Sequence, residues 1–534
     1  MPTDLLHNQD HENSSARNHC NDVDKQHDFI VCGSGSAGSV VAARLAENPN
    51  VRVLLIEAGG SDDVPEVMTP GQWPLNLGSE RDWGFVAQPN PNLNGRSIPL
   101  NMGKVVGGGS SINVLVWARG HKNDWEHFAE VSGDPAWRYD SVLEIYRRVE
   151  NYRGIGDPVR RGAAGPVYVE SASNPQPVAF AMVEAAVSLG IPRFENPNGE
   201  MMEGRGGAAI NDLIVHNGRR FSMFRSYVYP RLGQPNLTLL TRTTVSKLIF
   251  DGSAVVGVEV VQDGKRSRYY ASQEVIVSLG AIHTPKLLLQ SGIGPEADLR
   301  KLRIPVVQHL PGVGANHQDH VSFGCIFAYR EPQQVGNGGS EATLYWTSDP
   351  SLKQPDMFHC QVEFPVPSAE TAYRGVPAHG WTMFAGLAHP KSRGTVRLSG
   401  PNVEDPVLID ANTLSHPDDL KAALSNIELC RQLGHSAPFE KLVKGEALPG
   451  KLPPADMADF ARDAAVTYWH QCGTAKMGRD AMSVVDGQLK VYGIDRLRVV
   501  DASIMPEITS GNTMAPCVVI GERAADAIKV AHRL

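Results

Sequence analysis

The sequence predicts an α/β protein in which a parallel-sheet domain is interrupted by a second domain built on an antiparallel sheet flanked by helices. Residues 28–56 show an apolar run, a glycine-rich turn, a helical pattern and a second apolar run, which is typical of a βαβ unit. Residues 321–398 contain several short segments in which apolar and polar side chains alternate, which indicates an antiparallel sheet. A strand and a helix expected within residues 496–530 then close the chain, and we assign them to the first domain.

The domain boundaries are expected where these patterns change. The first domain is predicted to comprise residues 27–158, 213–312 and 486–534, and the second domain residues 159–212 and 313–485. Residues 1–26 are polar and lack the apolar core of a signal peptide, so we expect them to form a disordered tail.

The periodicity of apolar side chains predicts the elements in chain order. Helices are expected at 38–46, 124–130 with Asp124 as a candidate cap, 139–152, 180–189, 285–290, 417–433 and 516–530. Strands are expected at 28–32, 51–56, 237–250, 255–261, 274–279, 321–329, 357–364, 381–387, 395–398 and 496–500. Residues 62–99 are rich in Pro, Asn and Gly, and we interpret them as a long excursion over the surface.

Composition and charge exclude several classes of protein. The 534-residue chain carries a net charge of -8 and has no basic cluster of the kind that nucleic-acid binding requires. Its densest basic spots, Arg147-Arg148 and Arg160-Arg161, are interpreted as solvated surface. The seven cysteines contain no CxxC pair, so we expect no disulfide framework, no metal site and a reducing, cytoplasmic location. No apolar run is long enough to span a bilayer.

A GxGxxG motif follows the first predicted strand and begins the first predicted helix. Its glycines are Gly33, Gly35 and Gly38, with Ser36 and Ala37 between the last two. This pattern suits a dinucleotide, because glycines permit a tight turn and let phosphates approach the positive end of a helix. Glu57, followed by Ala58, ends the next strand nineteen positions after Gly38, about where a ribose ligand is expected. The motif alone does not separate FAD from NAD.

Five ordered segments resemble a known family. Their sequences are GKVVGGGSSIN at 103–113, GAIHTP through SGIGP at 280–295, GVGANHQDH at 312–320, WHQCGTAKMG at 469–478 and GNTMAP at 511–516. They are similar to the shared segments of the glucose–methanol–choline (GMC) oxidoreductases, with their choline dehydrogenase-like and alcohol oxidase-like members. The resemblance covers nearly all of residues 29–531.

The resemblance implies FAD as the cofactor and alcohol oxidation as the activity. It places further cofactor contacts at Val106, Gly108, Ser110, Asn113, Val245, Trp469, Asp501, Ala502, Asn512, Thr513 and Met514. Some relatives attach FAD covalently through a histidine near the first shared segment. This chain has no histidine between Gly103 and Gly120, so we expect FAD to be noncovalent.

The resemblance also implies a catalytic pair, His470 and Asn512. Oxidation of an alcohol removes the hydroxyl proton, which needs a base, and a hydride, which goes to flavin N5. An imidazole suits the base role, and an amide can hold the oxygen as charge develops on it without titrating. The chain departs from many relatives at Gln471 and Ala475. Trp469 is interpreted either as a wall of the pocket or as packing, and Cys472 as a buried, inert thiol.

The substrate and the electron acceptor are less determined. We expect a small primary alcohol, either aryl, furfuryl or aliphatic, with O₂ or a quinone as acceptor. Either His359 and Gln361, or Phe358 and Phe364, are expected to face the pocket. Choline is the first alternative, although its ammonium would want a carboxylate among aromatic rings, and the sequence does not place Glu363. The remaining alternatives are a hydroxynitrile-lyase-like enzyme with a non-redox flavin, a non-catalytic FAD sensor and an NAD-dependent dehydrogenase.

Overall fold

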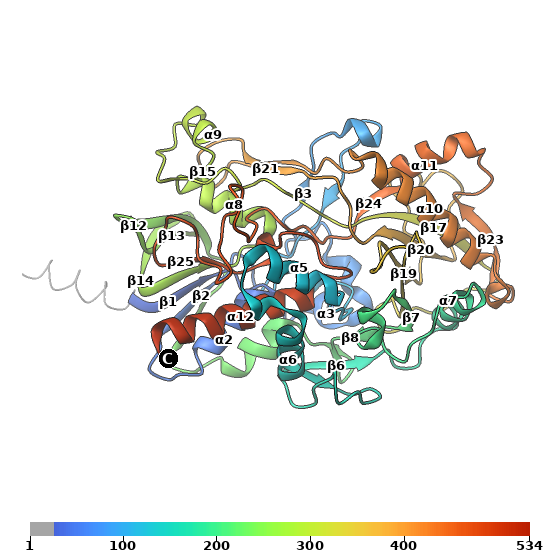
Figure 1. The fold of residues 1–534 in the computed structure, drawn as a ribbon, viewed down its shortest axis with the longest axis horizontal. Helices are drawn as coiled ribbons and strands as arrows, with labels where there is room; N and C mark the ends of the chain where they lie inside the picture. Colours follow the sequence, from blue (N-terminus) through green and yellow to red (C-terminus); the bar gives the residue numbers. More distant parts are fainter. Residues whose placement is uncertain (1–25) are drawn as a thin grey trace, which may run out of the picture.

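The computed structural model describes residues 26–534, which form two lobes side by side (Figure 1). One lobe contains a mixed sheet, and the other contains an antiparallel sheet. The buried apolar side chains divide in the same way, into one large cluster in each lobe. Residues 1–25 of the predicted tail lie outside the described residues, and Gln26 is the first residue of strand β1. The exact domain boundaries stay a prediction.

The sheet of the first lobe has a parallel core. Strand β1 pairs in parallel with β2 and β14, β11 pairs in parallel with β2, and β25 pairs in parallel with β14. Antiparallel β13 and β12 extend the sheet beyond β14. The strands are β1 (Gln26–Cys32), β2 (Val53–Ile56), β11 (Leu237–Leu240), β12 (Thr244–Asp251), β13 (Ala254–Gln262), β14 (Lys265–Val277) and β25 (Leu497–Val499). Every residue of β2 is buried, as expected for a strand covered on both faces.

Two helices from opposite ends of the chain pack together on this lobe (Figure 1). They are α2 (Ser36–Leu45), which follows the glycine-rich turn, and α12 (Met514–His532), which closes the chain. Gly521 allows the contact, because a Cβ there would lie 2.8 Å from the Ala37 carbonyl oxygen and 2.8 Å from Val40 Cβ. The packing brings the N-terminal ends of both helices toward one cavity.

The second lobe is built on a wholly antiparallel sheet. Its strands are β7 (Gly207–Ile210), β17 (Val321–Tyr329), β18 (Ala342–Trp346), β19 (Met357–Val362), β20 (Gly380–Leu387), β23 (Val443–Leu448) and β24 (Ala465–Thr467). The helices around it are α7 (Pro177–Ser188), α10 (Pro417–Gly434) and α11 (Met457–Ala464) (Figure 1). This agrees with the predicted antiparallel sheet flanked by helices.

Short elements complete the fold. The remaining helices are α3 (Pro65–Met68), α4 (Gly109–Ile112), α5 (Lys122–Ser132), α6 (Tyr139–Val149), α8 (Gly280–Gln290) and α9 (Glu296–Lys301). Small ladders form between β3 (Phe85–Val86) and β4 (Pro99–Leu100), β9 (Val215–His216) and β10 (Arg219–Arg220), β15 (Ile293–Gly294) and β16 (Gln308–His309), β21 (Thr395–Leu398) and β22 (Val407–Asp410), and among β5 (Glu150–Tyr152), β6 (Val167–Ser171) and β8 (Asp212–Leu213). No helix in residues 26–534 is long and apolar enough to cross a membrane.

Several predicted elements have different boundaries. Residues 237–250 form two strands, because Arg242 between them adopts a positive φ of 52° and turns the chain. The segment 395–398 pairs with β22 in a separate ladder and does not join the large antiparallel sheet. Helix α8 begins at Gly280, five residues before its predicted start, and accommodates Pro285 inside its first turns.

Asp124 is not the cap of its helix. The N-cap of α5 is His121, whose side chain accepts from the Asn123 N–H, while Asp124 accepts from the His121 backbone N–H in a capping box. The capping prediction was wrong because a histidine ring took the place of the usual Ser, Thr, Asp or Asn.

Two surface interpretations were also wrong. Arg161 is buried and pairs with Glu150 and Asp212 at 2.8 and 2.6 Å, so it is part of an internal charge network. Residues 62–99 do not merely cross the surface: Leu93 and Ile98 enter the core of the second lobe. The prolines and glycines of this segment interrupt regular helices and strands, but several of its apolar side chains are still buried.

Candidate functional site

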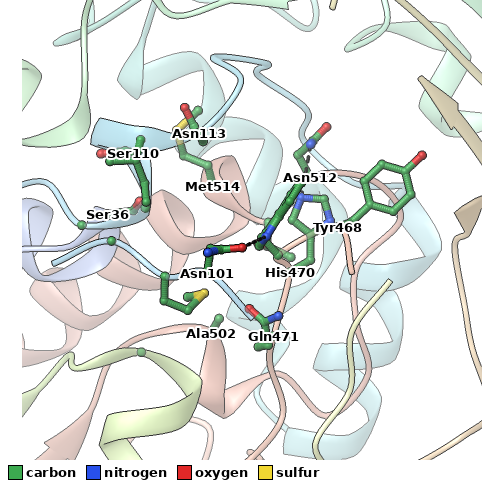
Figure 2. Close-up of a pocket in the computed structure, with 18 of the residues that line it drawn as sticks. Ser36, Asn101, Ser110, Asn113, Tyr468, His470, Gln471, Ala502, Asn512 and Met514 are labelled. Atoms are coloured by element: carbon green, nitrogen blue, oxygen red, sulfur yellow. Dashed lines mark hydrogen bonds between the residues drawn. The ribbon is translucent and has the colours of Figure 1, made fainter. Parts of the chain in front are cut away.

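A large cavity lies between the two lobes and receives residues from both. Its space, with the open mouth included, is about 1980 Å³. Predicted site residues that line it are Gly33, Gly35, Ser36, Ala37, Glu57, Ala58, Gly108, Ser110, Asn113, Trp469, His470, Asp501, Ala502, Asn512, Thr513 and Met514. Figure 2 shows many of them facing one space. The lining thus joins the glycine-rich turn of the first lobe to the segment around His470 in the second.

Three predicted cofactor residues do not line the cavity. Gly38 packs against the turn behind it, since a Cβ there would lie 2.0 Å from the Gly33 carbonyl oxygen. Val106 and Val245 are buried in the core of the first lobe. The role of Gly38 is therefore close packing of the helix, as its place in the motif predicts. Contact of Val245 with the adenine stays a prediction.

The glycines at the cofactor end leave room where phosphates need it. Gly33 has a φ of 99°, and a Cβ on it would lie 2.2 Å from the Ser278 carbonyl oxygen. A Cβ on Gly35 would meet no atom within 4 Å, so it would stand in the cavity itself. Gly35 is the N-cap of α2, whose first N–H groups lack intrahelical partners. This cradle fits the pyrophosphate of FAD.

Two carboxylates line the cofactor end. Glu57 accepts from the Ser34 N–H, the Ser34 hydroxyl and the Gly59 N–H at 3.0, 2.8 and 2.8 Å. Asp501 accepts from Gly280 N–H and Thr284 Oγ1 at 2.9 and 2.5 Å. Burial raises the pKa of both carboxyls, whereas these hydrogen bonds oppose the rise. Glu57 thus holds the glycine-rich turn and also lines the cavity.

The other end of the cavity holds the predicted catalytic pair. His470 Nε2 and Asn512 Nδ2 are 3.2 Å apart, although 42 residues separate them in the chain (Figure 2). Asn512 lies two residues before the start of α12, and His470 follows β24 of the second lobe. The two lobes therefore each contribute one member of the pair. Burial lowers the pKa of His470 to about 3, so its imidazole is neutral near pH 7.

A second histidine fixes the orientation of the first. His320 Nδ1 lies 2.9 Å from His470 Nδ1, and His320 Nε2 lies 3.0 Å from the Ala388 carbonyl oxygen. Because a carbonyl only accepts, His320 carries its proton on Nε2 and accepts at Nδ1. His470 must then donate from Nδ1, which leaves the lone pair of its Nε2 facing Asn512 and the cavity. Burial and His470 keep the pKa of His320 well below its usual value.

The segment that carries His470 is held by a buried carboxylate. Asp319 accepts from the His470 N–H at 2.9 Å, from Gln471 Nε2 at 2.8 Å and from the Thr467 hydroxyl. Burial raises the pKa of Asp319 to about 7, although each of these donors opposes that rise. Gln471, where the chain departs from many relatives, is thus part of the support of the base.

Trp469 is a wall of the cavity. Its backbone has a positive φ of 61°, and its indole Nε1 donates to Asn101 Oδ1 at 3.1 Å (Figure 2). Its ring meets Trp73 edge-on with centroids 6.4 Å apart. Trp73 comes from the segment 62–99, so this segment contributes to the site. Of the two interpretations of Trp469, the structure supports the wall.

The wall opposite the cofactor is aromatic and neutral. On β19 the face that lines the cavity is Phe358, Cys360 and Val362, while His359 is buried on the other face. Phe358 stacks on Tyr468 with centroids 4.8 Å apart, and Tyr468 stacks on His470 at 5.7 Å. The expected alternation along this strand is confirmed, but with Cys360 and Val362 in place of Phe364.

Residues that line this part of the cavity also carry buried polar atoms without a protein partner among the described residues. Asn211 Oδ1, Ser322 Oγ, Ser340 Oγ and Gln471 Oε1 are all buried and lack a hydrogen-bond partner within residues 26–534. Such atoms are costly unless a ligand or water pairs with them. Glu363, which the sequence did not place, is buried away from the lining, where it accepts from the Gly336 N–H at 2.6 Å.

Sequence reasoning missed His320, Asn211, Ser322 and Ser340. His320 ends a segment that the resemblance includes, but nothing in its spacing indicates contact with His470, 150 residues later. Ser322 lies on β17, where alternation alone does not distinguish a cavity face from a packed face, and Asn211 and Ser340 lie just outside strands. Cys472 is fully buried, and burial holds the pKa of its thiol well above the usual value, as expected for an inert cysteine.

Family comparison agrees with the geometry. Residues 27–322 and 390–521 match the N-terminal and C-terminal domains described as GMC oxidoreductase. The chain is 36% identical to proteins named oxygen-dependent choline dehydrogenase from Brucella anthropi and Rhizobium etli. Each match covers 94% of this chain and 95% of the relative.

Solved structures with the same fold include two oxidases. Pyridoxine 4-oxidase from Mesorbium loti matches with a TM-score of 0.90 and 33% identity, over 95% of this chain and 99% of that one. A formate oxidase matches with a TM-score of 0.86 and 27% identity, again over 95% and 99%.

Proposed function

Because the chain belongs to the GMC oxidoreductase family and is an FAD-dependent alcohol oxidoreductase, we propose that it oxidises a neutral aromatic primary alcohol to the aldehyde. The observation that carries this proposal is the pair His470 and Asn512, 3.2 Å apart in a buried cavity, with the lone pair of His470 Nε2 left free by His320. The alternative of an NAD-dependent dehydrogenase does not account for the match to the GMC oxidoreductase family.

The residues of the cofactor end fit FAD. The turn at Gly35 and the start of α2 would hold the pyrophosphate, and Glu57 would face the ribose. Asn113 and the start of α12 would lie beside the flavin, because Asn113 Nδ2 reaches Met514 Sδ at 3.2 Å, two residues after Asn512. When bound, FAD supplies the acceptor for the hydride that leaves the carbinol carbon. We propose that FAD is held noncovalently, since residues 103–120, which include the first shared segment, contain no histidine to which it could be attached.

His470 takes the proton of the alcohol. Its Nε2 carries the lone pair beside Asn512, and its pKa of about 3 keeps it unprotonated at neutral pH. Asn512 donates its amide N–H to the alcohol oxygen as negative charge grows there. His320 keeps the base in the productive tautomer, and Asp319 keeps its backbone in place.

The charge of the cavity supports a neutral substrate. The described carboxylates that line it are Glu57 and Asp501, both at the cofactor end. The substrate end offers aromatic faces at Phe358, Phe384 and Tyr468, together with unpaired hydroxyl and amide groups. A planar alcohol with a polar ring substituent satisfies both.

Choline is the second candidate, and it rests on the relatives named oxygen-dependent choline dehydrogenase. Aromatic rings alone can hold a quaternary ammonium, but a carboxylate beside them would strengthen that binding. Glu363 does not line the cavity. We therefore rank choline below an aromatic alcohol.

For the acceptor we propose O₂, because the names of the relatives and of pyridoxine 4-oxidase describe oxygen-dependent proteins or oxidases. We also propose a cytoplasmic location, since the six described cysteines are free thiols.

The test is flavin reduction without oxygen. The purified protein, loaded with FAD, is mixed anaerobically with benzyl alcohol, a hydroxymethylpyridine bearing a ring hydroxyl, furfuryl alcohol and choline. We expect the flavin colour to bleach fastest with the hydroxylated pyridine and slowest with choline. Admission of air should restore the colour with formation of peroxide. Faster bleaching with choline would reverse the ranking, and a flavin that no alcohol bleaches would favour the lyase alternative. FAD that stays soluble after acid precipitation would support noncovalent binding.

A further inference from the structure

Arg220 is a fully buried arginine behind the wall of the cavity. It belongs to β10, and its side chain is 0% exposed. Its guanidinium donates to four neutral acceptors: the carbonyl oxygen of Val67 at 2.9 Å, that of Ser110 at 3.2 Å, that of Asn113 at 2.6 Å, and Asn113 Oδ1 at 2.6 Å. No carboxylate of residues 26–534 forms an ion pair with it, whereas buried cations in proteins are nearly always paired.

Other buried arginines in the structure follow the usual rule. Arg119 and Arg161 share Glu150, at 2.5 and 2.8 Å, and Arg498 pairs with Glu274 at 2.6 Å. Arg220 differs because the partners of its guanidinium are neutral oxygen atoms, from three backbone carbonyls and one side-chain amide. Burial lowers the pKa of Arg220 to about 9, which still leaves it protonated near pH 7. A fixed positive charge therefore stands unpaired inside the first lobe.

The position of that charge relates it to the cofactor. Ser110 and Asn113 line the cavity, and Asn113 Nδ2 contacts Met514 Sδ near the catalytic pair (Figure 2). The lining itself contains no Lys or Arg among the described residues. Its two histidines, His283 and His470, both have a pKa lowered to about 3 by burial. Arg220 is thus a cation directly behind the lining residues Ser110 and Asn113.

We propose that Arg220 is a positioning residue that holds the Ser110–Asn113 loop and whose charge favours the reduced flavin. This rests on FAD occupying the cavity. In the reaction the alcohol would lose a proton to His470 and a hydride, which carries both electrons, to the flavin, so the reduced flavin would carry one more negative charge than the oxidised form. A cation one layer away stabilises that extra charge, and the dry surroundings weaken screening. The charge therefore raises the midpoint potential of the bound flavin.

Three variants separate charge from architecture. Arg220→Met keeps the length and removes the charge, and Arg220→Lys keeps the charge and loses the planar fork. Arg219→Met is the matched control, because Arg219 is the neighbouring residue on the same strand and is exposed. The midpoint potential of each FAD-loaded protein is measured by equilibration with a reference dye, together with the FAD content and the melting temperature.

The expected result is a potential that follows the charge. Arg220→Met should shift the flavin reduction equilibrium at least tenfold toward the oxidised form, about 30 mV for two electrons. Arg220→Lys should stay within about threefold of the wild type, and Arg219→Met should not change. Equal potentials in the Met variant and the wild type would overturn the charge role. If the Met variant holds no FAD, the Lys variant decides alone. A shift of tenfold or more in the flavin reduction equilibrium of a folded Lys variant would then overturn the proposal. Loss of FAD from both variants would overturn it as well. Failure of FAD to bleach with alcohols would not move these potentials, so it is distinguishable from failure of this inference.

Discussion

The two ends of the cavity are built in different ways. At the cofactor end, Gly33, Gly35 and the start of α2 present backbone groups, and their shape is set by where a Cβ is absent. At the substrate end, side chains from β17, β18 and β19 and from the segment after β24 define the chemistry. Recognition by backbone groups depends on the local conformation of the chain and little on side-chain identity, so it suits a cofactor that does not vary. Side-chain recognition allows one residue to change the substrate without disturbing the fold.

The largest expected effect comes from filling the backbone cradle. Gly35→Val places a side chain into open cavity, where it meets no protein atom but occupies the phosphate position. We expect FAD affinity to fall roughly 100-fold or more, about 3 kcal/mol, without a change in melting temperature. The matched control is Gly33→Val, which should also destabilise the apoprotein, because Gly33 has a positive φ and a close backbone neighbour. FAD titration of both apoproteins checks this. Wild-type affinity in Gly35→Val would show that the cofactor end does not work as described.

The next effect tests the substrate end at its reacting atoms. His470→Ala should lower the rate of anaerobic flavin reduction by about 2–4 kcal/mol of barrier, roughly 30- to 900-fold, with FAD content unchanged. His359→Ala is the control, since His359 is equally buried but lies on the face of β19 that points away from the cavity. A rate in His470→Ala within threefold of the wild type, measured by stopped flow, would remove the base role.

A smaller effect should come from the residue that orients the base. His320→Phe leaves the Nδ1–H of His470 without an acceptor, so both tautomers become accessible. We expect a loss of about 1–3 kcal/mol, roughly 5- to 150-fold, in flavin reduction. His317→Phe, in the same segment and equally buried, should affect only stability. Equal kinetic losses in the two variants would mean that His320 acts through packing alone.

The pH dependence sharpens the same point. The folded pKa of His470, about 3, lies below the unfolded value near 6.5, so the base is neutral and active above about pH 4. The rate should therefore show no break near pH 6.5. Stability should fall with acid instead, because between pH 6.5 and 3 the unfolded state binds a proton that the buried imidazole does not. Rates and melting temperatures measured from pH 5 to 8 check both parts. A kinetic pKa near 6.5 that disappears in His470→Ala would contradict this assignment.

The contrast between the two ends also explains what the sequence predicted. The βαβ unit, the glycine-rich turn and the pair of His470 and Asn512 were predictable, because local patterns and ordered motifs encode them. His320 and Arg220 were not, since their roles arise from contacts with residues more than 100 positions away. Arg161 was misplaced for a related reason, since its partner Asp212 lies 51 positions away. Asp124 was misplaced for a local reason, because a histidine three residues before it caps the helix. Segment 62–99 lacks periodicity, yet the fold buries its Leu93 and Ile98.

The smallest expected effect concerns substrate choice. Asn211→Leu removes the unpaired amide oxygen of a buried residue at the substrate end and keeps the number and branching of the side-chain heavy atoms. A ring hydroxyl of the substrate would lose one hydrogen bond, so kcat/KM for a hydroxylated aromatic alcohol should fall by about 0.5–1.5 kcal/mol, roughly 2- to 13-fold. Benzyl alcohol, which has no ring hydroxyl, should be oxidised as well as before and serves as the control within the same variant. A parallel fall for both alcohols would mean that Asn211 shapes the cavity without reading the ring. A fall for the hydroxylated alcohol alone would show that selectivity rests on side chains, as the comparison of the two ends requires.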